Sequence, residues 1–249
     1  MDEMTDDQLW AEAIGEDASV RTAALNELAL RAINARELDQ ALSITAAEID
    51  AARASEDEHL MAEAIGLHGS VLWDIGRHLE AAADLLDSAK LFVSAGNRAD
   101  AGLTHLRIAM CMWEADMPEA IMPNARIALD YYSSEPFYNV LPHALLELAD
   151  RLSSAGRFDE GLELIRASQE LCVTNDAPHG IMHARIHEAH LLHTSGQSEM
   201  AQQLLLAWRD EAIEAGDDTL ACQLTMSAGE VLNDSEQFLQ AHVLVLGTI

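Results

Sequence analysis

The segment LLELADRLSSAGRFDEGLELI, residues 145–165, carries two apolar stretches of helical spacing on either side of a glycine. Leu145, Leu148 and Leu152 recur at intervals of three and four residues, which places them on one face of an α-helix. The apolar residues that follow Gly156 continue this spacing, and glycine is a common residue at the end of a helix. The segment therefore predicts two helices joined by a short turn.

The same pattern recurs with a period of 40 residues. Small residues form one column: Ala29, Gly69, Ala109, Ala149, Ala189 and Gly229. Apolar residues follow three positions later: Ala32, Leu72, Met112, Leu152, Leu192 and Leu232. Helix breakers form two further columns: Gly76, Gly156 and Gly196, and then Glu56, Gly96, Pro136, Asp176 and Gly216. Because small side chains let helices approach closely and breakers end them, each period predicts one helix hairpin.

These columns set the expected boundaries along the chain. Hairpins are predicted at 19–33/37–54, 59–75/79–95, 99–115/118–133, 138–155/158–173, 179–195/198–215 and 219–233/237–249. A short helix over residues 5–14 is expected to cap the first hairpin. Residues 1–249 are predicted to form a single solenoid domain of six repeats over 19–249. The last helix ends on the apolar run 243–246, so we expect self-association through it or a continuation of the chain.

The third hairpin is expected to depart from this regularity. Four of the five prolines lie between Met117 and Pro142, and proline disfavours a continuous helix. Its second helix and the turn after it are therefore expected to be irregular. The aromatic residues in this segment would fill a local bend or form an exposed patch for a partner.

Composition excludes several classes of protein. The chain has 249 residues, 43 acidic against 14 basic, and a net charge of −29. Its 49% hydrophobic content is that of a folded protein. The acidic N-terminus predicts no secretory signal, and no apolar run is long enough to span a membrane. The charge disfavours direct binding of nucleic acid or anionic lipid, and three separated cysteines indicate reduced thiols in a cytoplasmic protein.

Two hairpins resemble the tetratricopeptide repeat. The fourth reads Leu145, Leu148-Ala149, Leu152, Gly156, Phe158, Gly161, Ile165. The second reads Ile65, His68-Gly69, Leu72, Gly76, His78, Ala81, Leu85. The resemblance covers residues 19–249, with a period of 40 in place of the commoner value of about 34, as in long-repeat variants. Arg185 and Glu188 depart from the pattern, and HEAT repeats, another α-solenoid of similar period, stay an alternative.

The resemblance implies an all-α, right-handed superhelical solenoid whose first helices line a concave groove for a peptide or protein. The groove positions it implies are Trp73, Asp74, Met110, Trp113, Glu114, Asp150, His183, Ile186, His190, His193 and Glu230, with Asn26, Leu30, Ser70, Leu106, His143, Leu146, Met226 and Asn233 beside them. Trp73 and Trp113 lie one repeat apart, and each precedes a carboxylate. Such a pair could clamp an apolar side chain while the acids hold a Lys or Arg, or it could pack between neighbouring helices.

A ladder of histidines follows one helix face: His179, His183, His187, His190 and His193. The simplest interpretation is a polar, partly solvated surface. Two alternatives remain: gain of charge at about pH 6 that alters ligand binding, and a metal site, for which His183, His187 and His190 are the candidates. The His187-Glu188-Ala189-His190 segment lacks the spacing of a zinc-protease motif, because that motif needs its second histidine at position 191.

The sequence therefore predicts a non-catalytic scaffold or adaptor, with no cofactor. No phosphate-binding loop of the GxxxxGK[ST] type and no G-x-S-x-G motif is present. The expected partner is a peptide or protein, and a basic one because of the strong negative charge. One alternative is a regulatory sensor of a small ligand or signal peptide. The other is an acidic inhibitor that mimics nucleic acid and occupies a DNA-binding protein.

Overall fold

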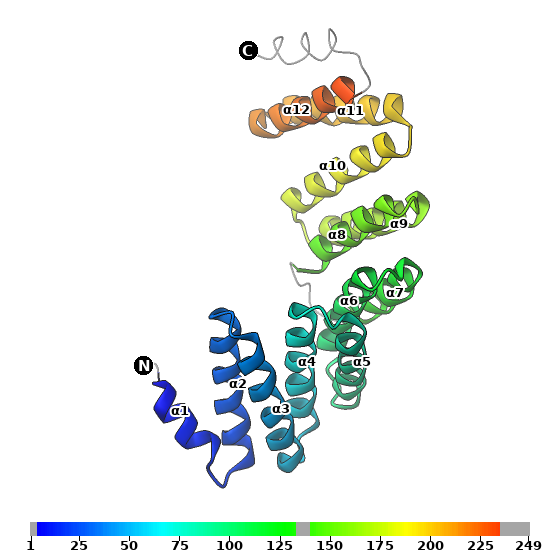
Figure 1. The fold of residues 1–249 in the computed structure, drawn as a ribbon. Helices are drawn as coiled ribbons and strands as arrows, with labels where there is room; N and C mark the ends of the chain where they lie inside the picture. Colours follow the sequence, from blue (N-terminus) through cyan, green and yellow to red (C-terminus); the bar gives the residue numbers. More distant parts are fainter. Residues whose placement is uncertain (1–3, 133–139, 235–249) are drawn as a thin grey trace. The chain divides into compact units, whose positions relative to one another are not determined.

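The computed structural model describes residues 4–132 and 140–234, and every regular element in these ranges is a helix (Figure 1). The chain divides into two compact units, Met1–Pro136 and Phe137–Ile249, which are described separately. The single domain expected over residues 1–249 stays a prediction.

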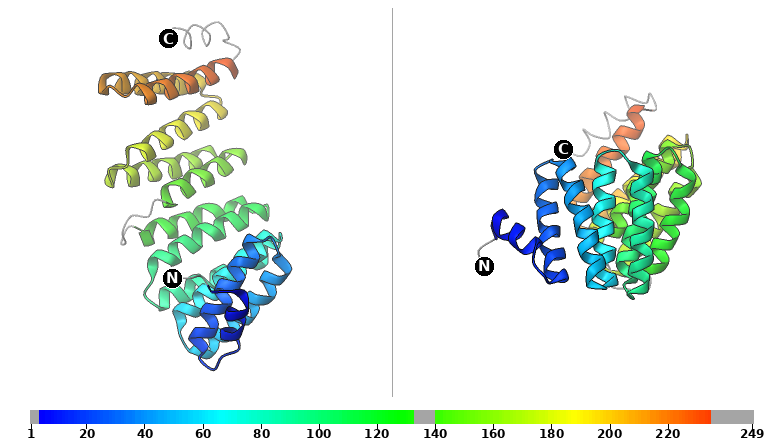
Figure 2. Two further views of the ribbon diagram at one scale, coloured as in Figure 1. Left: turned by 90° about the vertical axis from the view of Figure 1, so that its left-hand side faces the viewer. Right: turned by 60° about the horizontal axis from the view of Figure 1, so that its bottom comes forward.

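Unit 1 contains a short helix and three helix hairpins. The short helix is α1 (Asp6–Ala13). The hairpins are α2 (Ala18–Asn34) with α3 (Leu38–Ser55), α4 (Glu58–Asp74) with α5 (His78–Ser94), and α6 (Arg98–Glu114) with α7 (Ile121–Tyr132). Each helix packs against the next one along the chain, as Figure 2 shows for α2 to α7.

Unit 2 repeats the same arrangement. Its helices are α8 (Val140–Ser154) with α9 (Phe158–Thr174), α10 (Pro178–Thr194) with α11 (Ser198–Ala215), and α12 (Asp218–Asp234). Helix α10 also contacts α8 and α12 directly. We call the first helix of each hairpin the A helix (α2, α4, α6, α8, α10, α12) and the second the B helix (α3, α5, α7, α9, α11). The helix predicted over 237–249, and the self-association expected through it, lie outside the described residues.

The turn inside each hairpin is a Schellman motif, in which a residue with positive φ ends the A helix. Gly76, Gly156 and Gly196 hold this position with φ of 82°, 73° and 87°. Arg36 and Asp116 hold it in the first and third hairpins, although they are not glycines. The next amide donates to a carbonyl of the apolar column, as Arg157 N does to Leu152 O at 2.8 Å. The apolar column therefore also marks the hydrogen-bond acceptor that closes each turn.

Turns between hairpins use the second breaker column in the same way. Glu56, Gly96, Asp176 and Gly216 all have positive φ, between 51° and 78°. Both breaker columns thus fall on left-handed backbone positions, where glycine avoids the steric cost that a Cβ atom imposes. The remaining member, Pro136, lies outside the described residues.

The irregular helix expected in the third hairpin begins with a 3-10 turn. Pro118–Ala120 form this turn, and α7 starts only at Ile121. The exit turn of the hairpin, with Phe137 and Tyr138, lies outside the described residues. Tyr131 is half-buried, with its ring 4.5 Å from the Arg98 guanidinium and in edge contact with His105. For Tyr131, the structure supports an aromatic residue packed inside the hairpin.

The core lies between neighbouring helices, both within a hairpin and between hairpins, and the small column allows their close approach. Ala29, Ala109 and Ala149 are fully buried. A Cβ atom at Gly69 would lie 3.2 Å from the carbonyl oxygen of Ala81, so the α4–α5 contact leaves little space for a larger residue. The leucines quoted from residues 145–152 are likewise buried in the α8–α9 core.

The all-α repeat fold predicted from the sequence is confirmed. Helix ends lie within two residues of the predicted ones for every described helix except α7, whose start is displaced by the 3-10 turn. The short helix expected over 5–14 is observed at Asp6–Ala13, where Thr5 and Gln8 form a capping box.

Candidate functional site

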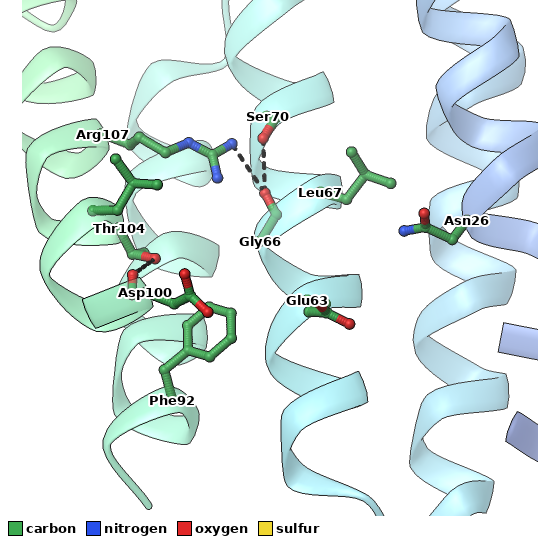
Figure 3. Close-up of a pocket in the computed structure, with 10 residues that line it drawn as sticks. Asn26, Glu63, Gly66, Leu67, Ser70, Phe92, Asp100, Thr104 and Arg107 are labelled. Atoms are coloured by element: carbon green, nitrogen blue, oxygen red, sulfur yellow. Dashed lines mark hydrogen bonds between the residues drawn. The ribbon is translucent and has the colours of Figure 1, made fainter. Parts of the chain in front are cut away.

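Unit 1 has a pocket of about 360 Å³ on the face of its A helices, which we call the α4–α6 pocket (Figure 3). Its lining residues come from α2, α4 and α6, with one ring from α5: Asn26, Glu63, Gly66, Leu67, Ser70, Phe92, Asp100, Leu103, Thr104 and Arg107. The face is therefore the one that the sequence predicts to be functional.

Arg107 is the basic group of this pocket. Its Nη2 donates to the carbonyl oxygen of Gly66 at 3.3 Å, and that oxygen also accepts from Ser70 Oγ at 2.8 Å (Figure 3). The guanidinium forms no ion pair with a carboxylate of the described residues. Burial lowers the pKa of Arg107, and Cys111 and Asp74 only partly oppose this effect. Arg107 is therefore a cation with little local compensation.

Acidic groups lie at the other end of the pocket. Glu63 is about half exposed, and among the described residues it pairs with His59 at 3.5 Å. Asp100 is half-buried and accepts a hydrogen bond from Asn97, the residue that caps α6. Behind the wall, Glu48 Oε1 accepts from Asn26 Nδ2 at 2.9 Å.

Glu48 is only 1% exposed, and its Oε2 has no hydrogen-bond partner among the described residues. Burial raises the pKa of Glu48 to about 7; the hydrogen bond from Asn26 opposes this effect, and the charge of Glu63 adds to it. A carboxyl group whose pKa is raised to about 7 thus lies behind the wall of the pocket, hydrogen-bonded to the lining residue Asn26.

In the described part of unit 2, pockets lie along α10. One of about 370 Å³ lies between α8 and α10 and is lined by Pro142, His143, Leu146, Cys172, Ala177, Pro178, His179, Gly180 and His183. A second, of about 330 Å³, lies one step further along these helices and is lined by Asp150, Ser153, Ser154, Ile186, His187, His190, Leu191 and Thr194. The third, of about 220 Å³, joins α10 to α11 and α12 through Ile186, Ala189, His190, His193, Leu205, Ser227, Glu230 and Val231.

All five histidines of the predicted ladder lie on pocket walls. His187 Nδ1 is 3.0 Å from Asp150 Oδ1, so α10 is tied to α8. His193 Nδ1 is 2.9 Å from Ser198 Oγ. No group of three His, Cys, Asp or Glu side chains is arranged to hold a metal ion in residues 4–132 and 140–234, and the candidate ligands His183, His187 and His190 form no such group.

The residues predicted for the groove of unit 2 are brought to one face. Asp150, Ile186 and His190 line the second pocket, and His183 lines the first. His193 and Glu230 line the third, together with Ile186 and His190. Their part in binding stays a proposal.

The residues predicted for unit 1 fall beside the pocket instead of in it. Trp73 is half-buried and packs against an apolar cluster that includes Leu72 and Leu85. Asp74 and Glu114 are exposed, and Met110 and Trp113 are half-buried. None of these five side chains lines the α4–α6 pocket. Of the neighbouring predicted positions, Asn26 and Ser70 do line it.

Sequence reasoning missed Glu63, Asp100 and Arg107. A signal for them exists: Glu63 and Ser70 are seven residues apart on one helix, and Asp100 and Arg107 have the same separation on another. Residues seven apart lie on one helix face two turns apart. Polar pairs at that spacing on two neighbouring A helices would have indicated a polar pocket.

No family model and no curated protein matches this chain. Solved structures do match its fold. Aspartyl phosphate phosphatase F from Bacillus subtilis is 11% identical to this chain, with a TM-score of 0.63. The match covers 98% of this chain and 62% of the phosphatase chain. This chain thus spans less than two thirds of that protein.

Two further structures extend the comparison. A signal transduction ATPase with a tetratricopeptide repeat sensor from Pyrococcus horikoshii is 12% identical to this chain, with a TM-score of 0.70. The match covers 97% of this chain and 38% of the ATPase chain. The Rap conjugation gene regulator of the plasmid pLS20, in complex with the Phr* peptide, is 12% identical with a TM-score of 0.52, covering 93% and 73%. The chain therefore has a tetratricopeptide-like fold, as its repeat pattern implies. Among the described residues, no helix combines the length and apolar character needed to cross a membrane.

Proposed function

We propose that the chain is a non-catalytic scaffold that binds a peptide or an extended segment of a protein on the A-helix faces of its two units. One observation carries this proposal: pockets of 220 to 370 Å³ lie on the A-helix face of each unit and combine apolar walls with charged or histidine side chains. Pockets with a few polar groups on an apolar surface are typical of binding sites. The peptide-bound Rap regulator has a similar fold, which supports the proposal at the level of the fold alone.

The chemistry of the two buried thiols agrees with a binding role. A cysteine nucleophile needs a thiolate, which a lowered pKa supplies. Burial raises the pKa of Cys111 to about 11 and raises that of Cys172 as well. Both thiols are therefore protonated at neutral pH and poorly reactive.

The partner that fits these surfaces is basic. The chain carries a net charge of −29, and Glu63, Asp100, Asp150 and Glu230 lie on pocket walls. Complementary charge speeds encounter and orients the partner. Exposed acids around the pockets would hold Lys and Arg side chains, and the apolar walls would hold the residues between them.

Three serine-to-lysine variants test the location of the site. A peptide is first selected against the wild-type chain from a displayed random library. Its affinity is then measured for Ser70→Lys and Ser154→Lys, which change pocket walls in units 1 and 2, and for Ser43→Lys, which is exposed on the B helix α3. At least one pocket variant should bind about tenfold more weakly, while Ser43→Lys binds as the wild type does. Equal affinity for all three variants would contradict an A-helix site.

A sensor of signal peptides is the second candidate. The similar ATPase is described as having a tetratricopeptide repeat sensor, and the similar Rap regulator was solved with a peptide. A sensor must transmit peptide binding, so the selected peptide should change the affinity of the chain for a second protein. A plain scaffold would bind the peptide without that change.

A further inference from the structure

We propose that the α4–α6 pocket holds the C-terminal basic residue of a peptide, with its free carboxylate on Arg107 and its side-chain cation at Glu63 and Asp100. The inference rests on the proposed function, because it names which part of a bound peptide enters this pocket. It adds a chemical class of ligand, a peptide that ends in Arg or Lys.

Arg107 supplies the positive charge of the pocket. A guanidinium has five N–H donors, and the one hydrogen bond found here is a 3.3 Å contact with a backbone carbonyl. Arg107 is half-buried, and a cation withdrawn from water without a paired anion is costly; a carboxylate that binds it in a bidentate manner offsets that cost. An anion beside Gly66 would therefore pair with Arg107.

Glu63 and Asp100 lie away from Arg107 along their helices. Glu63 precedes Ser70 by seven residues on α4, and Asp100 precedes Arg107 by seven residues on α6. Seven residues correspond to about 10 Å along a helix axis. Both acids therefore lie at the opposite end of the pocket from Ser70 and Arg107, as Figure 3 shows. The pocket is polarised, with a cation at one end and two carboxylates at the other.

An apolar wall connects the two ends of the pocket. Leu67 and Leu103 line it, and Phe92, which is 6% exposed, lies beside Asp100 at the acidic end (Figure 3). Lys and Arg side chains lay their methylene groups along apolar surface and keep the charged head in a polar setting. An apolar wall between an anion site and a cation site matches the order of groups in a basic residue with a free carboxylate.

A C-terminal residue satisfies both ends at once. An internal Lys or Arg would leave Arg107 without an anion, because its own carbonyl is part of a peptide bond. A terminal acidic residue would supply the anion but place a second negative charge near Glu63 and Asp100. A basic residue at the C-terminus is therefore the ligand that the charges select.

Synthetic peptide pools test the assignment directly. Each pool has five randomised positions, a fluorescent label at the N-terminus, and a defined last residue: Arg as the free acid, Arg as the amide, or Ala as the free acid. We measure anisotropy with the full chain at low salt. The Arg acid pool should bind at least about tenfold more tightly than either other pool, the size expected for losing one charge-assisted hydrogen bond.

Two variants separate the two ends of the pocket. Arg107→Gln should remove the preference for acid over amide and keep the preference for Arg over Ala. Glu63→Gln should weaken the preference for Arg and keep the preference for the free acid. Arg77→Gln, an exposed arginine paired with Glu80 outside the pocket, is the matched control and should change neither. Helical circular dichroism checks that each variant is folded. The charge-conserving Arg107→Lys variant is the folding control for Arg107→Gln.

The outcomes distinguish this inference from the function on which it rests. If the three pools bind the wild-type chain equally, the chain binds peptides but the C-terminal assignment is wrong. If no pool binds, both the assignment and the proposed function fail. The comparison of acid and amide pools uses the wild-type chain alone, so a variant that does not fold cannot obscure the result.

Discussion

At the scale of single residues, Glu48 couples the stability of unit 1 to pH. Its carboxyl is buried in α3, and burial raises its pKa from 4.5 to about 7. Below pH 4.5 the group is neutral in both folded and unfolded chains. Between 4.5 and 7 it ionises in the unfolded chain first, so the folded state loses stability as pH rises. Above pH 7 the loss is complete.

We therefore expect Glu48→Gln to stabilise the chain more at pH 8 than at pH 5. A difference of one unit between the folded and unfolded pKa values corresponds to about 1.4 kcal/mol. The gain in unfolding free energy on Glu48→Gln should therefore be about 3 kcal/mol at pH 8. Urea unfolding of both proteins at the two pH values measures it. Glu12→Gln, an exposed change in α1, serves as the control and should show no such pH-dependent gain. A gain of Glu48→Gln that is equal at pH 5 and pH 8 would show that Glu48 does not titrate in this range.

Residues of the candidate site were partly predictable. The histidines of α10, with Asp150 and Glu230, were found because they lie on the A-helix face at repeat positions. Arg107 and Glu63 were not found, because the volume around them depends on the sizes of Leu67, Leu103 and Phe92 across three helices. A repeat pattern gives the face of a helix, whereas a pocket depends on what neighbouring side chains leave empty.

At the scale of the helices, the turn positions make the repeat. Gly76 and Arg36 occupy equivalent positions with φ of 82° and 62°. Left-handed backbone costs a residue with a Cβ atom about 1 kcal/mol or more, and glycine avoids that cost. The two breaker columns were visible in the sequence because glycine holds three positions of the first and two of the second. Arg36 and Asp116 were not recognised as members of the first column, because its other members are all glycine.

The same substitution should therefore have opposite effects at two arginines. Arg36→Gly is expected to stabilise the chain by about 1 kcal/mol, because it relieves left-handed backbone. Arg53→Gly, inside α3, is expected to destabilise it by about 1 kcal/mol, because glycine disfavours helix. Thermal unfolding of both variants measures the signs. Destabilisation by Arg36→Gly would mean that its side chain contributes more than its backbone costs.

The contact between α9 and α10 predicts a steric effect. A Cβ atom at Gly180 would lie 2.4 Å from the Cys172 sulfur, which is buried. Gly180→Ala should therefore destabilise unit 2 by about 1–3 kcal/mol despite the better helix propensity of alanine.

A double-mutant cycle with Cys172→Ala provides the check. Removing the sulfur makes space for the new methyl group, so Gly180→Ala should cost much less in the Cys172→Ala background. The same cost in both backgrounds would locate the clash elsewhere.

At the scale of the whole molecule, the charge of −29 sets the salt dependence of binding. Exposed charges are screened over about 10 Å at 0.1 M salt and over about 3 Å at 1 M. We expect the affinity for a basic peptide to fall at least about fivefold between 50 mM and 500 mM salt, mainly through a slower association rate. Stopped-flow association at several salt concentrations measures this, and an association rate independent of salt would contradict a basic partner.

The fold of each unit followed from the sequence because the 40-residue period places small, apolar and breaker residues in one phase. The start of α7 did not follow from the sequence, because the first turn at Pro118 is a 3-10 turn and Pro123 lies close behind it. Proline fixes φ and removes an amide donor, so it allows several local solutions that a repeat pattern does not distinguish. The 40-residue pattern thus predicts the helix ends in hairpins that follow it, and does not predict the start of α7 in the third hairpin.

The central claim is that the A helices bind the partner, and photo-crosslinking tests it most directly. A selected peptide carrying a photoreactive residue at each position in turn is crosslinked to the wild-type chain, and the attached residues are identified by mass spectrometry. We predict crosslinks on α4, α6, α8 and α10, at or beside pocket residues such as Ser70, Arg107 and Ile186. Crosslinks confined to the B helices α3, α5 and α9 would contradict the account.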